Sequence, residues 1–148
     1  MVLDTSAVLA ILLNEPEAPA FERAIESDPT RLMSAASFLE TAIVIEARFG
    51  EAGGVELDLL VHKAGIDIAA VTADQAEIGR QAFRQYGRGR HPAAMNFGDC
   101  FAYALSRTSG EPLLFKGDDF SRTDVTPVVE RGFVPPGNRQ PRANPLGD

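Results

Sequence analysis

The sequence predicts a single α/β domain in which helices cover both faces of a mostly parallel sheet. Short apolar runs alternate along the chain with longer amphipathic stretches, as they do where helices connect parallel strands. The chain has 148 residues, of which 45% are hydrophobic, and this is enough for one sizeable core. No internal repeat or low-complexity segment interrupts residues 1–134, which we expect to form the domain.

The first half of the chain predicts two short strands and four helices. Residues 1–3 are an apolar strand, and the following helix would be capped by Thr5 or Ser6 and would end near Pro16. Residues 31–37 predict a short strand or entry turn. The other helices are expected at residues 18–27, 37–50 and 55–65, with Gly50 and Gly65 at the ends of the last two.

The second half repeats this alternation. A strand at residues 66–71 precedes a helix that Thr72 would cap, and a loop at 87–96 precedes a helix that begins near Asp99. Residues 111–117 predict a buried strand, and an acidic turn follows it. Residues 135–148 have no apolar periodicity, so we expect a disordered tail there.

The composition of the chain indicates its cellular compartment and the kinds of partner it could bind. The single cysteine, Cys100, excludes an intramolecular disulfide and favours a reducing cytoplasm; we expect its side chain in the core. The N-terminal segment lacks a basic start and carries Asp4, so neither a signal peptide nor a membrane anchor is expected. The net charge of −7 does not by itself indicate nucleic-acid binding.

Acidic residues stand at strand ends and helix starts, where α/β folds bind their ligands. Each also has a structural interpretation: Asp4 as a helix cap, Glu40 in a capping box with Ser37, and Asp99 in the first turn of a helix that Asn96 would cap. The remaining two, Asp118 and Asp119, lie in a turn, where Asp is common.

Convergence of these acids would need a cation. Two carboxylates about 4 Å apart repel by roughly 4 kcal/mol at an effective dielectric near 20, and a divalent ion is the usual compensation. Oxygen ligands favour Mg²⁺, or alternatively Mn²⁺, over zinc. The two histidines, His62 and His91, follow no ligand spacing.

Four segments together resemble the PIN-domain ribonucleases, and most closely the VapC toxins of bacterial type II toxin–antitoxin modules. They are "MVLDTSAVLAILLNEPE", "SFLETAIVIEARFG", "NFGDCFAYALS" and "PLLFKGDDFSRTDV", and the resemblance runs from residue 1 to about residue 128. It implies a PIN-like α/β/α sandwich and a metal-dependent endoribonuclease. It also implies inhibition by a VapB-type antitoxin and assembly as a homodimer.

The resemblance also implies roles for individual residues. Asp4, Glu40 and Asp99 match the first three acids of the family, and Thr5 and Ser6 match a hydroxyl pair that often follows the first. The usual slot of the fourth acid holds Gly117, so the fourth acid is expected to be Asp118, with Asp119 as the alternative.

Within this set Asp4 and Asp99 would bind Mg²⁺ directly. Glu40 and Asp118 would hold its waters or a second ion, and Glu40 could orient or deprotonate the attacking water.

Two further surfaces are expected. Arg80, Arg84, Arg88, Arg90 and His91 form a basic stretch without an intervening acid, which together with Lys116 and Arg122 either binds RNA or is a solvated surface. The apolar stretches "VLAILL" and "FLETAIVIEARF" are expected to leave a groove for the antitoxin. The shifted fourth acid leaves an alternative function open, a non-catalytic PIN-like module that binds RNA or protein.

Overall fold

The computed structural model describes residues 1–128, so the tail expected at 135–148 and the end of the predicted domain lie outside the described residues. Its sheet contains the short strands β1 (Val2–Leu3), β2 (Leu32–Ser34), β3 (Asp67–Ala69) and β4 (Leu113–Leu114). They are ordered β3-β2-β1-β4, and every pairing is parallel. The predicted parallel α/β fold is confirmed.

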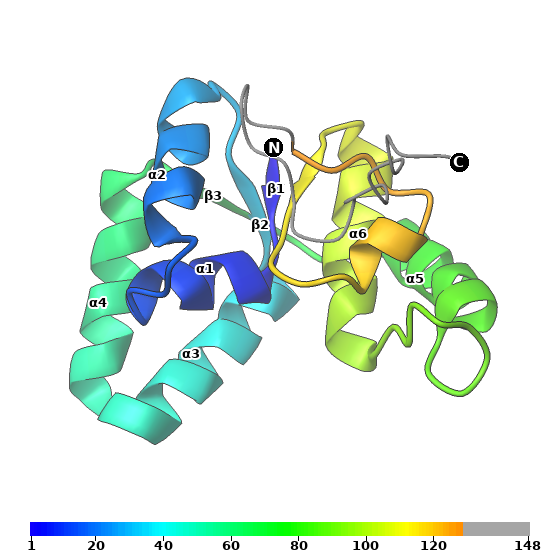
Figure 1. The fold of residues 1–148 in the computed structure, drawn as a ribbon, viewed down its shortest axis with the longest axis horizontal. Coiled ribbons are helices and arrows are strands. Elements are labelled where there is room, and N and C mark those ends of the chain that lie inside the picture. Colours follow the sequence, from blue (N-terminus) through cyan, green and yellow to red (C-terminus); the bar gives the residue numbers. More distant parts are fainter. Residues whose placement is uncertain (129–148) are drawn as a thin grey trace, which may run out of the picture.

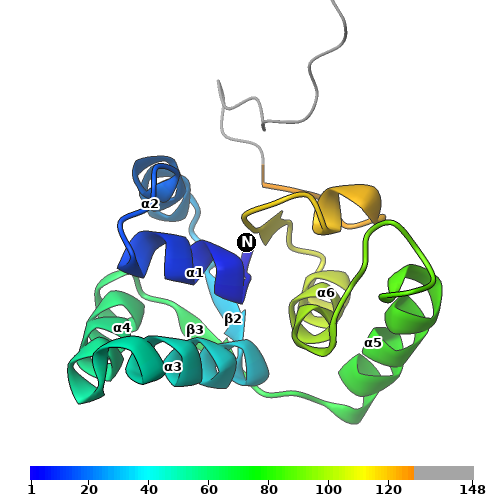
Figure 2. The same ribbon diagram turned by 60° about the horizontal axis from the view of Figure 1, so that its bottom comes forward.

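Helices cover the sheet from both sides (Figure 1; Figure 2). One side carries α1 (Thr5–Leu12), α2 (Ala18–Ser27), α3 (Ala35–Phe49) and α4 (Glu51–Lys63). The other carries α5 (Ala73–Tyr86) and α6 (Phe97–Ser109), and the 3-10 helix η1 (Phe120–Arg122) follows β4. None of the helices in the described residues is long and apolar enough to span a membrane.

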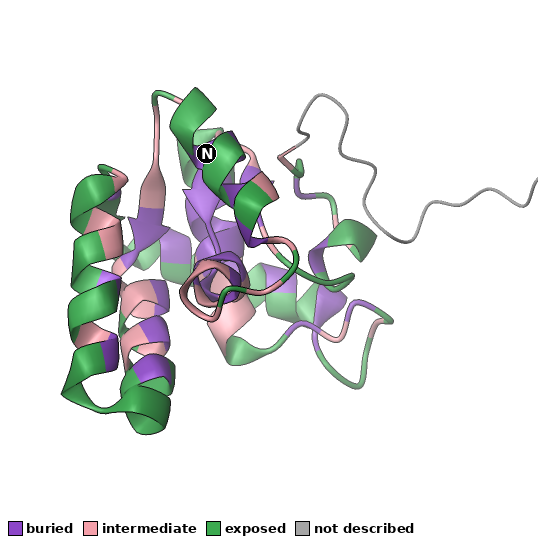
Figure 3. Ribbon diagram, turned by 60° about the vertical axis from the view of Figure 1, so that its left-hand side comes forward, coloured by how far each residue is buried: buried purple, intermediate pink, exposed green. Residues whose placement is uncertain are grey.

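Successive side chains of the central strands β1 and β4 point to opposite faces of the sheet, and they belong to two separate parts of the core. Leu3 and Leu114 pack against the α1–α4 side, whereas Val2 and Leu113 pack against α5 and α6. This is the period of two expected when both faces of a strand are buried. Figure 3 shows the burial concentrated on the strands and on the sides of the helices that face them. The carboxyl ends of β1 and β4 are therefore held by core on both faces.

Two helix starts differ from the sequence-based expectation. The cap of α1 is Asp4, because its side chain accepts a hydrogen bond from the backbone N–H of Ser6, so neither Thr5 nor Ser6 caps this helix. α3 begins at Ala35, two residues before Ser37, and its cap is Ser34, whose side chain accepts from the N–H of Ala36. Ser37 and Glu40 therefore lie inside the helix, and the expected capping box between them is absent.

Other boundaries move by a few residues. α4 begins at Glu51 rather than at residue 55, because Gly53 lets the helix pack directly on the backbone carbonyl of Ile45 in α3. The caps predicted at Thr72 and Asn96 are confirmed.

Candidate active site

Asp4 lies at the carboxyl end of β1 and caps α1. Its Oδ2 accepts from the backbone N–H of Ser6 at 3.0 Å and from the Ser6 hydroxyl at 2.6 Å. The same hydroxyl accepts from the backbone N–H of Lys116 at 2.9 Å, which ties the end of β4 to the end of β1. The hydroxyl of the neighbouring Thr5 donates to the backbone carbonyl of Ser37 in α3. The first acid is thus fixed in position by three neighbouring segments.

Asp99 lies in the first turn of α6 and forms a reciprocal capping box with Asn96. Its Oδ2 accepts from the backbone N–H of Asn96, and its own N–H donates to Asn96 Oδ1, each at 2.9 Å. The structural interpretation of Asp99 as a helix-start residue is therefore correct. It does not exclude a role in the site, because a carboxylate can accept a backbone N–H and still have free lone pairs.

Glu40 reaches this same turn from α3. A Cβ added to Gly98 would overlap the Glu40 carboxylate, so the two are in direct contact. Gly98 is the residue before Asp99, and glycine is unusual inside a helix because it costs roughly 1 kcal/mol relative to Ala. The close approach explains its presence. Gly98 was not singled out from the sequence, although a glycine inside a predicted helix start was the available signal.

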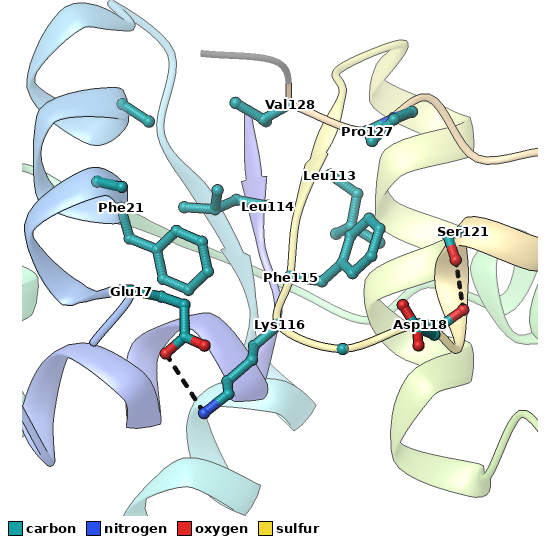
Figure 4. Close-up of a pocket in the computed structure, with 13 residues that line it drawn as sticks. Glu17, Phe21, Leu113, Leu114, Phe115, Lys116, Asp118, Ser121, Pro127 and Val128 are labelled. Atoms are coloured by element: carbon teal, nitrogen blue, oxygen red, sulfur yellow. Dashed lines mark hydrogen bonds and ion pairs between the residues drawn. The ribbon is translucent and has the colours of Figure 1, made fainter. Parts of the chain in front are cut away.

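The turn after β4 carries the adjacent acids Asp118 and Asp119, and the structure gives them different surroundings. Asp118 lines an apolar cavity of about 140 Å³ between α2 and β4, together with Phe21, Leu114 and Val128 (Figure 4). Asp119 begins η1, and its charge acts on Asp99. Gly117 has a φ of 96°, a conformation that favours glycine, so an acid in the family's usual slot would be strained.

Two of the carboxylates, Asp4 and Asp99, have raised pKa values, mainly because they are buried. Burial raises the pKa of Asp4, the hydrogen bonds from Ser6 oppose this, and the charge of Glu40 adds to it. Burial also raises the pKa of Asp99 to about 6, opposed by the N–H of Asn96 and reinforced by the charges of Asp4, Asp119 and Glu40. Four segments that are distant in sequence thus bring negative charge to one place.

The donor set fits a hard divalent cation by its chemistry. All four acids offer only oxygen, and the two histidines lie elsewhere: His62 is exposed at the end of α4, and His91 packs edge-on against Tyr86. In residues 1–128 no three potential ligand side chains are close enough to hold a metal ion as they stand. Mg²⁺ commonly takes one or two carboxylates and keeps its waters, so a pair such as Asp4 and Asp99 matches it.

The basic stretch is only partly available to a ligand. Arg80 and Arg84 are exposed on α5, and Arg88 and Arg90 are exposed in the following loop. His91 does not belong with them, because its ring contacts Tyr86 and its Nδ1 accepts from the N–H of Ala93. Lys116 is also engaged, since its ammonium forms ion pairs with Glu15 and Glu17.

The two apolar stretches differ in exposure. The residues of "VLAILL" pack against the core. On α3, by contrast, Leu39 and Ile43 are 59% and 61% exposed and lie one turn apart. The expected groove formed by both stretches is therefore not supported, because the first stretch belongs to the core. What remains available is an apolar face of α3 and, beside the acids, the cavity of Figure 4.

Comparison with known proteins identifies the family of this chain. Residues 1–125 match the PIN domain family. The chain is 61% identical over 129 residues to Ribonuclease VapC30 of Mycobacterium tuberculosis, which covers 87% of this chain and 98% of that protein. It is 60% identical over 128 residues to Ribonuclease VapC of Mycolicibacterium smegmatis, covering 86% and 99%.

Solved structures share the fold at low identity. The crystal structure of Mycobacterium tuberculosis VapC20, described as a sarcin–ricin loop cleaving toxin, aligns with a TM-score of 0.70 at 20% identity over 86% of this chain and 97% of that one. VapBC2 from Rickettsia felis, bound to a DNA fragment of its promoter, aligns with a TM-score of 0.65 at 14% identity over 85% and 94%. By its sequence relatives and its fold, the chain belongs to the VapC ribonucleases of the PIN-domain family.

Proposed function

We propose that this VapC-family endoribonuclease hydrolyses RNA phosphodiester bonds at an acidic site formed by Asp4, Glu40, Asp99 and Asp119. The observation that supports the site most strongly is the contact of the Glu40 carboxylate with Gly98 beside Asp99, in a place where burial and the charges of Asp4, Asp119 and Glu40 raise the pKa of Asp99 to about 6. Such mutual repulsion is retained in a fold where a bound cation offsets it.

The choice of Asp119 revises the sequence-based expectation of Asp118. Asp119 carries a charge that acts on Asp99, whereas Asp118 faces the cavity lined by Phe21 and Leu114. Both acids are exposed and adjacent. The preference for Asp119 therefore depends on its electrostatic interaction with Asp99. Substitution of each residue separately tests it.

In the proposed mechanism Asp4 and Asp99 hold a divalent cation, Mg²⁺ or alternatively Mn²⁺. The ion supplies positive charge that stabilises the phosphoryl transition state and makes water more acidic. Ser6 keeps the Asp4 carboxylate in place through its two hydrogen bonds. Glu40, in contact with Gly98, orients or deprotonates the attacking water, and Asp119 completes the negative site from the turn after β4.

Arg80, Arg84, Arg88 and Arg90 supply the contact to the RNA backbone. They are exposed, and their charge opposes the repulsion between a polyanion and the acids. Substitution of Arg84, Arg88 and Arg90 by Ala should weaken RNA binding and reduce its salt dependence. Unchanged salt dependence would mean that these arginines are only a solvated surface.

We further propose that a VapB-type antitoxin inhibits this chain and that it forms a homodimer in the cytoplasm. Two structural neighbours support the partner: the Rickettsia felis complex and a toxin–antitoxin complex from Klebsiella pneumoniae. The exposed apolar face around Leu39 and Ile43 is a surface that a protein partner would cover. A monomer at micromolar concentration in light scattering would exclude the dimer.

The decisive experiment is cleavage of a single-stranded RNA by the purified chain. We expect cleavage with millimolar Mg²⁺, loss of cleavage in EDTA and recovery when the ion is restored. RNA binding without cleavage under all metal conditions would instead support the non-catalytic PIN-like module.

A further inference from the structure

A second groove lies on the opposite side of α6 from the acids. It has a volume of about 410 Å³ and runs between α5 and α6, lined by Gly79 and Phe83 from one helix and by Phe97 and Phe101 from the other. Phe97 is 78% exposed, more than any other large apolar residue among residues 1–128, and its ring meets Phe101 edge-on with centroids 4.9 Å apart. An aromatic face is thus presented to solvent at the start of α6.

The position of Phe97 connects this groove with the acidic site. Phe97 and Asp99 are both in the first turn of α6, and residues two positions apart project from different sides of a helix. A helix with its side chains is about 10–12 Å across, a distance that an extended strand of RNA covers within a few nucleotides. A strand whose phosphate lies at Asp99 is therefore long enough to reach the groove with a nucleotide a few positions along.

The charge around the groove matches a polyanion. Arg80 lines it, and Arg84 follows one turn later on the same helix. Arg80 pairs with Glu77 at 3.3 Å, but both side chains are more than half exposed. Exposed pairs of this kind contribute little and are readily exchanged for a phosphate.

We propose that the groove of Phe83, Phe97 and Phe101 is a nucleobase subsite, in which Phe97 stacks on an unpaired base a few nucleotides from the cleaved phosphodiester. Base stacking on aromatic side chains, with Arg at the backbone, is how proteins hold single-stranded RNA. The subsite rests on the proposed function for its substrate. It assigns to Phe97 a role in choosing which unpaired nucleotides are presented to the acids.

RNA is favoured over a protein occupant by two observations together. The groove combines exposed aromatic rings with arginine, and only the width of α6 separates it from Asp99. The apolar face around Leu39 and Ile43 is aliphatic and is the surface expected of a protein contact. The experiment below separates the two occupants, because a base needs a flat ring and a protein contact needs only apolar area.

The test measures Kd for a single-stranded RNA in EDTA, and kcat and KM in Mg²⁺, for the full chain and three variants of Phe97. Phe97→Trp keeps a flat ring, Phe97→Leu keeps apolar area without one, and Phe97→Ala removes both. We expect Trp to bind like wild type, and Leu and Ala to raise Kd roughly 5- to 100-fold. The control is Phe49→Ala at the end of α3, where the ring is 54% exposed and packs with Arg48; it should leave Kd unchanged.

A second arm uses RNAs that lack one base at a time. Removing the base that stacks on Phe97 should weaken binding to wild type but not to Phe97→Ala, and removing other bases should affect both proteins equally. If no position shows this coupling, the subsite is wrong.

The proposal is also overturned if Leu matches wild type while Ala changes the oligomeric state, since Phe97 is then a protein contact. A wild-type chain that shows the coupling in Kd without cleaving RNA would refute the proposed activity and leave the subsite standing.

Discussion

Asp4 and Asp99 stand in the first turns of two helices, and each accepts a backbone N–H from its own helix start. Asp118 and Asp119 instead lie in an exposed turn, where Asp119 begins η1 without a capping hydrogen bond from its side chain. The first pair is buried or half-buried and has raised pKa values. Capping and the proposed catalytic role are therefore compatible for these two acids, because a carboxylate held by a backbone N–H still has lone pairs for a ligand.

The comparison also explains why the fourth acid can vary in position. A carboxylate fixed by a helix start cannot move by one residue without leaving its N–H donors. A carboxylate in an exposed turn can, provided that the turn directs it toward the others. Gly117, with its positive φ, shapes such a turn here.

The largest effect is expected from removing a charge in the helix-start pair. Asp4→Asn and Asp99→Asn should each lower kcat/KM by orders of magnitude, because the amide keeps the cap but binds a divalent cation poorly. The control is Asp74→Asn in the first turn of α5, which should cost about 0.3–1 kcal/mol of stability and leave cleavage intact. Full activity of Asp99→Asn would mean that Asp99 is only a cap.

A smaller effect on cleavage is expected from substituting the acids of the exposed turn, and it should differ between Asp118 and Asp119. Asp119→Asn should reduce cleavage about tenfold or more, whereas Asp118→Asn should stay within about twofold of wild type, because Asp118 faces the cavity of Figure 4. Comparing kcat for both variants under saturating Mg²⁺ checks this. The reverse order of effects would restore Asp118 as the fourth acid.

Much of the fold was predictable because its signals are local. Alternating apolar segments predict the parallel sheet, and the caps at Thr72 and Asn96 are sequence features that the structure confirms. The start of α3 was placed wrongly because Ser34 and Ser37 are both acceptable caps. The choice between them depends on where β2 ends, which is a tertiary effect.

The site was predictable in its residue types but not in its contacts. The contact between Glu40 and Gly98 joins two helices, and nothing local to either segment specifies it. The same holds for the hydrogen bond from Lys116 to Ser6, which links residues 110 positions apart. His91 was grouped with the arginines because it follows them in sequence, but its ring is used to pack against Tyr86.

The contact at Gly98 gives a third prediction, in which activity and stability separate. Gly98→Ala should leave stability unchanged or raise it by up to about 1 kcal/mol, because Ala favours a helix and the atom it meets is the end of a long side chain. Cleavage should fall about tenfold as the Glu40 carboxylate is displaced. The matched control is Gly54→Ala, which meets the carboxylate of Glu46 in the same way on α4 and should not affect cleavage.

The smallest effect concerns the stability of the metal-free protein as a function of pH. The pKa of Asp99 is raised to about 6 by burial and by neighbouring acids, above its ordinary value of 3.8. The native state therefore binds the proton more tightly than the unfolded state, and the resulting stabilisation is complete below about pH 4 and is lost as the pH rises through 6.

In EDTA the free energy of unfolding of wild type should consequently fall, relative to Asp99→Asn, between pH 4.5 and 7.5. A two-unit shift corresponds to at most about 3 kcal/mol, and solvent screening of this half-buried group reduces the expected difference to about 1 kcal/mol. Denaturant unfolding of both proteins across this range measures it. A difference that does not change with pH would show that neither burial nor the neighbouring acids raise the pKa of Asp99, and the cluster of acids around it would then be wrong.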